Sequence, residues 1–146
     1  MTSLAAGDGT ACVAANGMAY CWGNGASGEL GGGVIPTGNT TDTLVQVALV
    51  PNVASVSIGN STGCATTTAG EVWCWGDNSS GQLGTGSVGG FTATPARVNL
   101  PATTAVSTGL SQSCAVTNAG LMCWGLVGLA SVGDGGVVPT PTLITW

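Results

Sequence analysis

The six cysteines are the residues of this sequence with the clearest capacity for chemistry, and their spacing predicts three disulfide bonds. They fall into pairs nine or ten positions apart with turn residues midway: Cys12 and Cys21, Cys64 and Cys74, Cys114 and Cys123. This spacing places the two thiols of a pair opposite each other on adjacent strands of a hairpin, within reach of a bridge. Other pairings are open in principle, and the pairwise repetition favours this one. Since disulfides persist in oxidising compartments, we expect an extracellular or cell-surface protein.

A metal site or a reactive thiol would be the alternative use of these cysteines. Zinc sites favour Cys-x-x-Cys pairs together with His, and the sequence contains neither. A reactive thiol needs a nearby cation or a helix N-terminus, and the one basic side chain is Arg97. We therefore predict disulfides, with no metal and no cofactor.

Acid–base catalysis finds little support in the residues present. The absence of His excludes the usual Ser-His-Asp and Cys-His arrangements. Glu29 and Gln82 occupy the same repeat position, which indicates a structural hydrogen bond and not a catalytic carboxylate pair. We predict that the protein is not an enzyme. A net charge of −5 with one basic residue also excludes nucleic-acid binding, because phosphates must be neutralised by Lys or Arg.

The cysteine pairs belong to a repeat of about fifty residues that occurs three times. The second copy contains Glu71-Val-Trp-Cys-Trp-Gly-Asp-Asn-Ser-Ser-Gly-Gln-Leu-Gly-Thr-Gly86, and recognisable versions follow Ala19 and Leu121. A period of this size is typical of solenoids, arrays and propeller blades. We divide the chain into units 1–52, 53–104 and 105–146, forming one continuous array that is open at both ends.

Each unit has the pattern of about four short antiparallel strands. In the second unit we expect strands at 53–59, 63–67, 72–76 and 94–100, separated by turns rich in Gly, Asn and Thr. The last strands of the second and third units are expected to open at Pro95 and Pro141, where no ladder N–H is needed. Four short strands are the make-up of a propeller blade, so the predicted fold is all-β.

The motifs also carry a family resemblance. Gly59…Cys64-Ala65, then Cys74-Trp-Gly, then Gly81-Gln-Leu-Gly-Thr-Gly86 resemble the repeat of the regulator of chromosome condensation family (RCC1), in a form with paired cysteines. The resemblance covers nearly the whole chain and implies one β-propeller-type blade per repeat. The family often carries His two residues before the first cysteine, where this chain has Thr10, Thr62 and Gln112. The loop that catalyses nucleotide exchange in some members is not recognisable here, so that activity is not expected.

Three blades are too few to close a propeller, and neither end has a polar cap. We therefore expect the ends to meet copies of the same chain or further blades of a longer chain. The third unit replaces the polar turn Asp77-Asn-Ser-Ser80 with an apolar one, which predicts an assembly interface. The predicted interface residues are Leu126, Val127, Leu129 and Trp146.

Charged residues make up only 5% of the chain, which suggests that something other than water covers its surface. Three N-glycosylation sequons begin at Asn39, Asn60 and Asn78, so glycans are one candidate cover. No run of about eighteen apolar residues predicts a membrane span. The leading hypothesis is a glycan-coated structural protein that assembles into a fibre or surface layer. The alternative is part of a longer secreted RCC1-like propeller that acts as a protein-binding module.

Overall fold

The computed structural model describes residues 2–128 and 136–145, and these form three four-stranded antiparallel sheets. We call the sheets blades 1 to 3. Blade 1 contains β1 (Ser3–Ala6), β2 (Thr10–Ala15), β3 (Met18–Asn24) and β4 (Thr40–Gln46), with a short 3-10 helix η1 (Thr37–Asn39) before β4. Blade 2 contains β5 (Val53–Ile58), β6 (Thr62–Thr67), β7 (Val72–Asp77) and β8 (Phe91–Val98). Blade 3 contains β9 (Thr103–Thr108), β10 (Gln112–Thr117), β11 (Gly120–Leu126) and β12 (Val137–Leu143).

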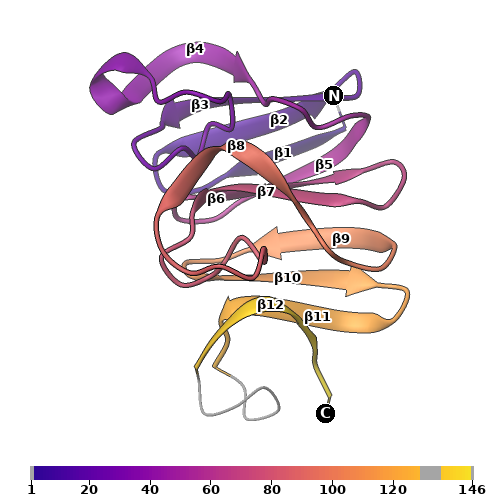
Figure 1. Cartoon of the computed structure of the whole chain (residues 1–146). Coiled ribbons are helices and arrows are strands. Elements are labelled where there is room, and N and C mark those ends of the chain that lie inside the picture. The colour runs from indigo at the N-terminus through magenta and orange to yellow at the C-terminus, as the bar shows by residue number, and fades with distance from the viewer. Residues whose placement is uncertain (1, 129–135, 146) are drawn as a thin grey trace.

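The three blades stack face to face in chain order, with blade 1 at one end and blade 3 at the other (Figure 1). Within each blade, consecutive strands are neighbours, so every sheet is a simple meander. The predicted all-β fold of three propeller-type blades with one disulfide each is confirmed. The described strands lie inside the ranges 1–52, 53–104 and 105–146, except β9, which begins at Thr103, two residues before the third range.

The hairpins that carry the cysteines close through short turns. In blade 1, Asn16 and Gly17 connect β2 to β3 with φ of 53° and 75°, the left-handed values that Asn and Gly tolerate best. Blade 2 uses a longer turn between Thr67 and Val72, with Gly70 at φ 79°. The longer turn accounts for a cysteine separation of 10 in blade 2, against 9 in blades 1 and 3.

The outer strands differ from the prediction at their beginnings. β8 begins at Phe91 and not at the predicted Thr94. The corresponding strands of the other two units, expected from Thr43 and Thr140, begin at Thr40 (β4) and Val137 (β12). Pro95 lies in a bulge, because residues 93–95 stand opposite Trp75 alone, between the pairs Cys74–Ala96 and Gly76–Thr92. Bulges on outer strands tolerate Pro because the ladder is already interrupted there.

The glycine after the second cysteine's tryptophan is fixed by a close approach of two backbone segments. Gly76 has a φ of 97°, and a Cβ at this position would lie 2.2 Å from the carbonyl oxygen of Ser61. A Cβ on Gly23 would lie 2.1 Å from the carbonyl oxygen of Gly9, and one on Gly125 would lie 2.4 Å from that of Ser111. The Cys-Trp-Gly triplet is therefore a backbone requirement of the blade.

Most of the apolar core lies between blades. One cluster joins Cys12 and Cys21 of blade 1 to Val56, Ala65 and Trp75 of blade 2. A second joins the corresponding residues of blade 2 to Ala115 and Trp124 of blade 3. Each blade therefore depends on its neighbour to cover its face.

Candidate assembly and binding surfaces

The three predicted disulfides are present, and each joins residues that face each other directly in the ladder. Cys64 and Cys74 are paired between β6 and β7 with a Cα–Cα distance of 4.1 Å, and both are fully buried. The Cys12–Cys21 bridge is equally buried, at the junction of blades 1 and 2. The Cys114–Cys123 bridge differs, because Cys114 is partly exposed on the far side of blade 3. Two bridges are thus covered by the next blade and the third is not.

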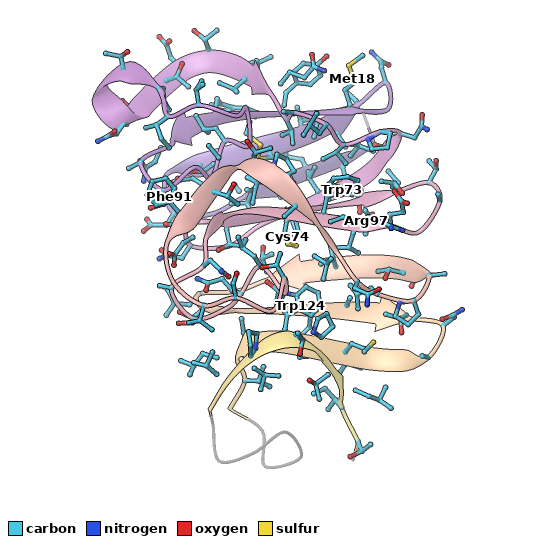
Figure 2. All side chains as sticks on the ribbon, viewed as in Figure 1. Met18, Trp73, Cys74, Phe91, Arg97 and Trp124 are labelled. Carbon is cyan, nitrogen blue, oxygen red and sulfur yellow. A yellow bond between two sulfur atoms is a disulfide. The ribbon has the colours of Figure 1, made fainter. Side chains whose placement is uncertain are left out.

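Tryptophans following the second cysteine connect neighbouring blades. The indole Nε1 of Trp124 donates a hydrogen bond to the backbone carbonyl of Gln82 in blade 2, at 2.8 Å. Trp124 is fully buried between these blades (Figure 2). Ser113 donates its hydroxyl to the same carbonyl at 2.9 Å. At each junction an apolar ring is thus buried and its indole also makes a directional contact.

The Gly-x-Leu-Gly motif forms the seat for the indole of the next blade. A Cβ on Gly84 would lie 2.7 Å from Nε1 of Trp124, and one on Gly31 would lie 2.9 Å from Nε1 of Trp75. The leucines of the motif, Leu30 and Leu83, are almost completely buried. The motif therefore belongs to the interface between blades.

The acidic or amide residue of this motif makes the predicted structural hydrogen bond. Oε1 of Gln82 accepts from the Ser80 amide at 2.8 Å, and Nε2 of Gln82 donates to Asp77 at 2.7 Å. In blade 1 the acid and the amide change places, since Glu29 stands at the position of Gln82 and Asn24 at that of Asp77.

Glu29 itself is fully buried. Its Oε2 accepts from the Ser27 amide at 2.7 Å, while Oε1 has no partner among the described residues. The sequence predicts the bond but gives no sign of this buried, half-satisfied carboxylate.

Threonines stand at two of the positions where the family often has His, and they bond within their own blades. The hydroxyl of Thr10 donates to the carbonyl of Asn24 at 2.9 Å, and that of Thr62 donates to the carbonyl of Asp77 at 3.0 Å. Both side chains are buried. They anchor the loop that follows Cys-Trp-Gly.

The open face of blade 1 is formed by the repeat positions that form the docking side of the two internal interfaces. Trp22, the counterpart of Trp75 and Trp124, is only partly buried, and its indole has no acceptor among the described residues. Val13 is also partly buried, and Leu4 is 66% exposed. This face is apolar and uncovered.

The open face of blade 3 contains a shallow apolar hollow of about 140 Å³. Its lining includes Ala105, Cys114, Val116 and Leu121. Val116 is 51% exposed, which is high for a valine in the middle of a strand. The hollow lies among β9, β10 and β11.

The predicted interface in the third loop is only partly exposed. Leu126 is 46% exposed and lines a second hollow with Leu110. Val127 is 2% exposed and packs with Cys123 and Ile144, so its inclusion in a docking patch was wrong. Its side chain completes the core of blade 3. Leu129 and Trp146 lie outside the described residues.

The three sequons differ in accessibility. Asn39 is exposed and Asn60 is partly buried. Asn78 is 4% exposed, and its Nδ2 donates to the carbonyl and the hydroxyl of Ser87 at 3.1 and 3.2 Å. A glycan on Nδ2 would disrupt these bonds, so the folded loop contradicts the choice of Asn78 as a glycan site.

The one basic side chain, Arg97, forms an ion pair with Glu71 at 2.9 Å on the surface of blade 2. Trp73 lies beside this pair, opposite Arg97 in the ladder, and its indole donates to Glu71 at 3.4 Å (Figure 2). Across the described residues there is no cluster of three or more His, Cys, Asp or Glu side chains suited to a metal ion. Within the same residues, no helix has the length and apolar character needed to cross a membrane.

Sequence comparison agrees with the repeat assignment. Residues 53–82 and 69–116 each match a model described as "Regulator of chromosome condensation (RCC1) repeat". The human regulator of chromosome condensation is 39% identical over 77 residues, which cover 53% of this chain and 18% of that protein. The mouse protein is 38% identical over a segment of the same length. The chain thus matches less than a fifth of these relatives' length.

Structural comparison extends the similarity to almost the whole chain. The structure of human WBSCR16 matches with a TM-score of 0.84 and 24% identity, covering 96% of this chain and 38% of that one. Yeast RCC1 (Prp20), solved bound to Kap60, matches with a TM-score of 0.81 and 19% identity, covering 97% of this chain and 36% of that one. At these identities the match establishes the fold.

Proposed function

We propose that this chain, in which residues 53–82 and 69–116 match the regulator of chromosome condensation repeat, is a non-enzymatic structural protein whose blades assemble with neighbouring blades in an oxidising, extracellular setting. The partners would be copies of the same chain or further blades. Repeat architectures of this kind bury their faces by stacking, and function is a property of the surfaces they present.

One observation carries the proposal: the contact made at both internal junctions has no counterpart at the open face of blade 1. The indoles of Trp75 and Trp124 are buried and donate to carbonyls of the preceding blade. Trp22 occupies the same position, yet it faces outward and is only partly buried. A preceding blade would bury Trp22 and supply its acceptor, as blades 1 and 2 do for the other two tryptophans.

The surface chemistry supports an extracellular structural role. Charged residues are 5% of the chain, so little electrostatic repulsion opposes close packing of copies. Each blade contains one disulfide, which suits a protein outside the reducing cytosol. Asn39, exposed at the end of η1 next to the outer strand β4, is the best placed of the sequons to carry a glycan without blocking a blade face.

Negative-stain electron microscopy and sedimentation of the non-reduced protein test the proposal. Regular filaments or sheets are expected, and intact-mass and peptide mapping of native material should find glycan at Asn39 and none at Asn78. Particles of a single copy at all concentrations would contradict an assembling protein. The naturally produced protein and unglycosylated recombinant chain, measured side by side, separate the effect of glycans from that of the blades.

A protein-binding module is the second candidate, favoured by a hollow on blade 2 that does not belong to the stacking faces. This hollow has a volume of about 310 Å³ and is lined by the 56% exposed Phe91 together with polar residues such as Thr85, Ser87 and Thr92. Aromatic residues such as Phe are enriched in protein-contact sites relative to the rest of the surface. Yeast RCC1, which shares the fold, was solved bound to Kap60. Discrete single particles that bind a partner through Phe91 would favour this function.

A further inference from the structure

The two internal interfaces use the same cross-strand pair of apolar residues on the blade that docks. Val56 and Ala65 are paired between β5 and β6 and pack against blade 1. Val106 and Ala115 are the corresponding pair between β9 and β10, and they pack against blade 2. The docking half of an interface is therefore defined by an apolar pair on the first two strands of a blade.

The receiving half is equally regular. Against Val56 and Ala65, blade 1 presents Cys12, Ala14 and Ala19. Against Val106 and Ala115, blade 2 presents Cys64 and Val72. The receiving surface thus consists of the first cysteine and small or β-branched neighbours on the middle strands.

The open face of blade 1 carries a docking half, and the open face of blade 3 carries a receiving half. Leu4 and Val13 are paired between β1 and β2 at the positions of Val56–Ala65 and Val106–Ala115, and they face outward from blade 1. The hollow on blade 3 is lined by Cys114, Val116 and Leu121, which occupy the repeat positions of Cys12, Ala14 and Ala19. Every molecule therefore presents an unfilled apolar hollow and an apolar pair placed to fill one.

We propose that copies of this chain join head to tail, with Leu4 and Val13 of one copy seated in the hollow of blade 3 of the next. The inference rests on the proposed function and names the contact that the assembly uses. It continues the established interface between blades: the pair that docks is larger than Val56–Ala65 or Val106–Ala115, and the surface that receives it is hollowed and uncharged. No charged side chain lines the hollow, so burial adds no desolvated charge.

A head-to-tail contact uses two different surfaces, so it leads either to a closed ring or to an open filament. Whole copies contribute blades in threes. Propellers close with about four to eight blades, so a ring of two copies, with twice three blades, falls within that range. Both a two-copy ring and a filament leave Trp22 covered by the blade in front of it.

Opposed charges at the two halves of the contact give a direct test in the non-reduced chain. Leu4→Lys and Val116→Asp each place a charge on an exposed position of one face, and each should weaken self-association by about tenfold or more in sedimentation velocity. Mixing the two variants should restore association in pairs, because the unaltered Leu4 face of the Val116→Asp chain can dock in the unaltered hollow of the Leu4→Lys chain. Leu44→Lys is the matched control, since Leu44 is a 58% exposed leucine of blade 1 on the outer strand β4, and this change should leave association unchanged.

The outcomes separate the contact from the function. Wild-type chains that associate while Leu4→Lys and Val116→Asp have no more effect than Leu44→Lys would overturn this contact and leave an assembling protein in place. Failure of the mixed variants to associate, where each alone has lost association, would also overturn it. Wild-type chains that stay single would overturn both the contact and the proposed function.

Discussion

The indole of Trp75 donates a hydrogen bond of 2.7 Å to the backbone carbonyl of Glu29, which lies 46 positions earlier in the chain and in the preceding blade. The ring itself is fully buried and belongs to the apolar cluster of blade 1. A single side chain thus provides both the apolar and the directional part of a blade junction.

Replacing this tryptophan should weaken folding much more than replacing its counterpart at the open face. Trp75→Phe removes buried volume and leaves the carbonyl of Glu29 without its donor, a loss of about 3 kcal/mol in the free energy of unfolding. Trp22→Phe should cost less than about 1 kcal/mol in the single chain, because Trp22 is only partly buried. Denaturant unfolding measures both, and equal losses would contradict the role given to the junction.

Two glycines with the same backbone angle separate steric clash from torsional strain. Gly76 and Gly89 both have φ of 97°, but a Cβ on Gly76 would meet the Ser61 carbonyl at 2.2 Å whereas one on Gly89 meets nothing within 4 Å. Gly76→Ala should therefore cost about 3 kcal/mol or more, and Gly89→Ala about 1 kcal/mol. Similar melting temperatures for the two variants would show that the close approach has little energetic weight.

Glu29→Gln should stabilise the protein. The carboxylate is fully buried with Oε1 unpaired among the described residues, whereas the amide of Gln82 satisfies both its ends in blade 2. Removing the buried charge is expected to add about 1 kcal/mol to the free energy of unfolding. The double variant Asn24→Asp with Glu29→Gln reproduces the pair of blade 2 and should be at least as stable. A loss of stability in both variants would show that Glu29 has a partner beyond the described residues.

Each disulfide should stabilise its hairpin mainly by restricting the unfolded chain. For the separation of 10 between Cys64 and Cys74, the chain-entropy model gives about 2.5 kcal/mol, so Cys64→Ala with Cys74→Ala should lower the free energy of unfolding by that amount. Guanidinium unfolding under non-reducing conditions provides the measurement. The Cys12→Ala and Cys21→Ala pair, with a separation of 9, is the control and should lose nearly the same. A far smaller effect for either pair would mean that the bridge adds strain to the native blade.

The local features of the fold follow from the sequence because they are set by nearby residues. The cysteine spacing and the Asn16-Gly17 turn act over a few positions, and the repeat restates such local patterns three times; all are found in the structure. The start of β8 was missed because a bulge around Pro95 lets the strand begin before the proline, and only the pairing with β7 reveals this. Local pattern identifies a strand well and its ends poorly.

Burial by residues that are not adjacent in the sequence is where the sequence is least informative. Val127 resembles an exposed apolar loop residue until Ile144, from the end of the chain, is placed against it. Asn78 satisfies a sequon by its neighbours alone, while its burial depends on Ser87 in the same loop. The fate of these side chains is decided by contacts that the pattern of adjacent residues does not encode.

Because the disulfides differ in burial, the rate of reduction of the Cys114–Cys123 bridge should report whether another blade covers blade 3. Small reductants must reach a sulfur to exchange with it, and Cys114 is reachable from solvent while Cys64 and Cys74 are sealed beneath the next blade. In isolated molecules the bridge at Cys114 should open first, and its lifetime should lengthen once another blade settles over it. The rate at which the Cys114 thiol appears would then measure the fraction of blade 3 faces that remain uncovered.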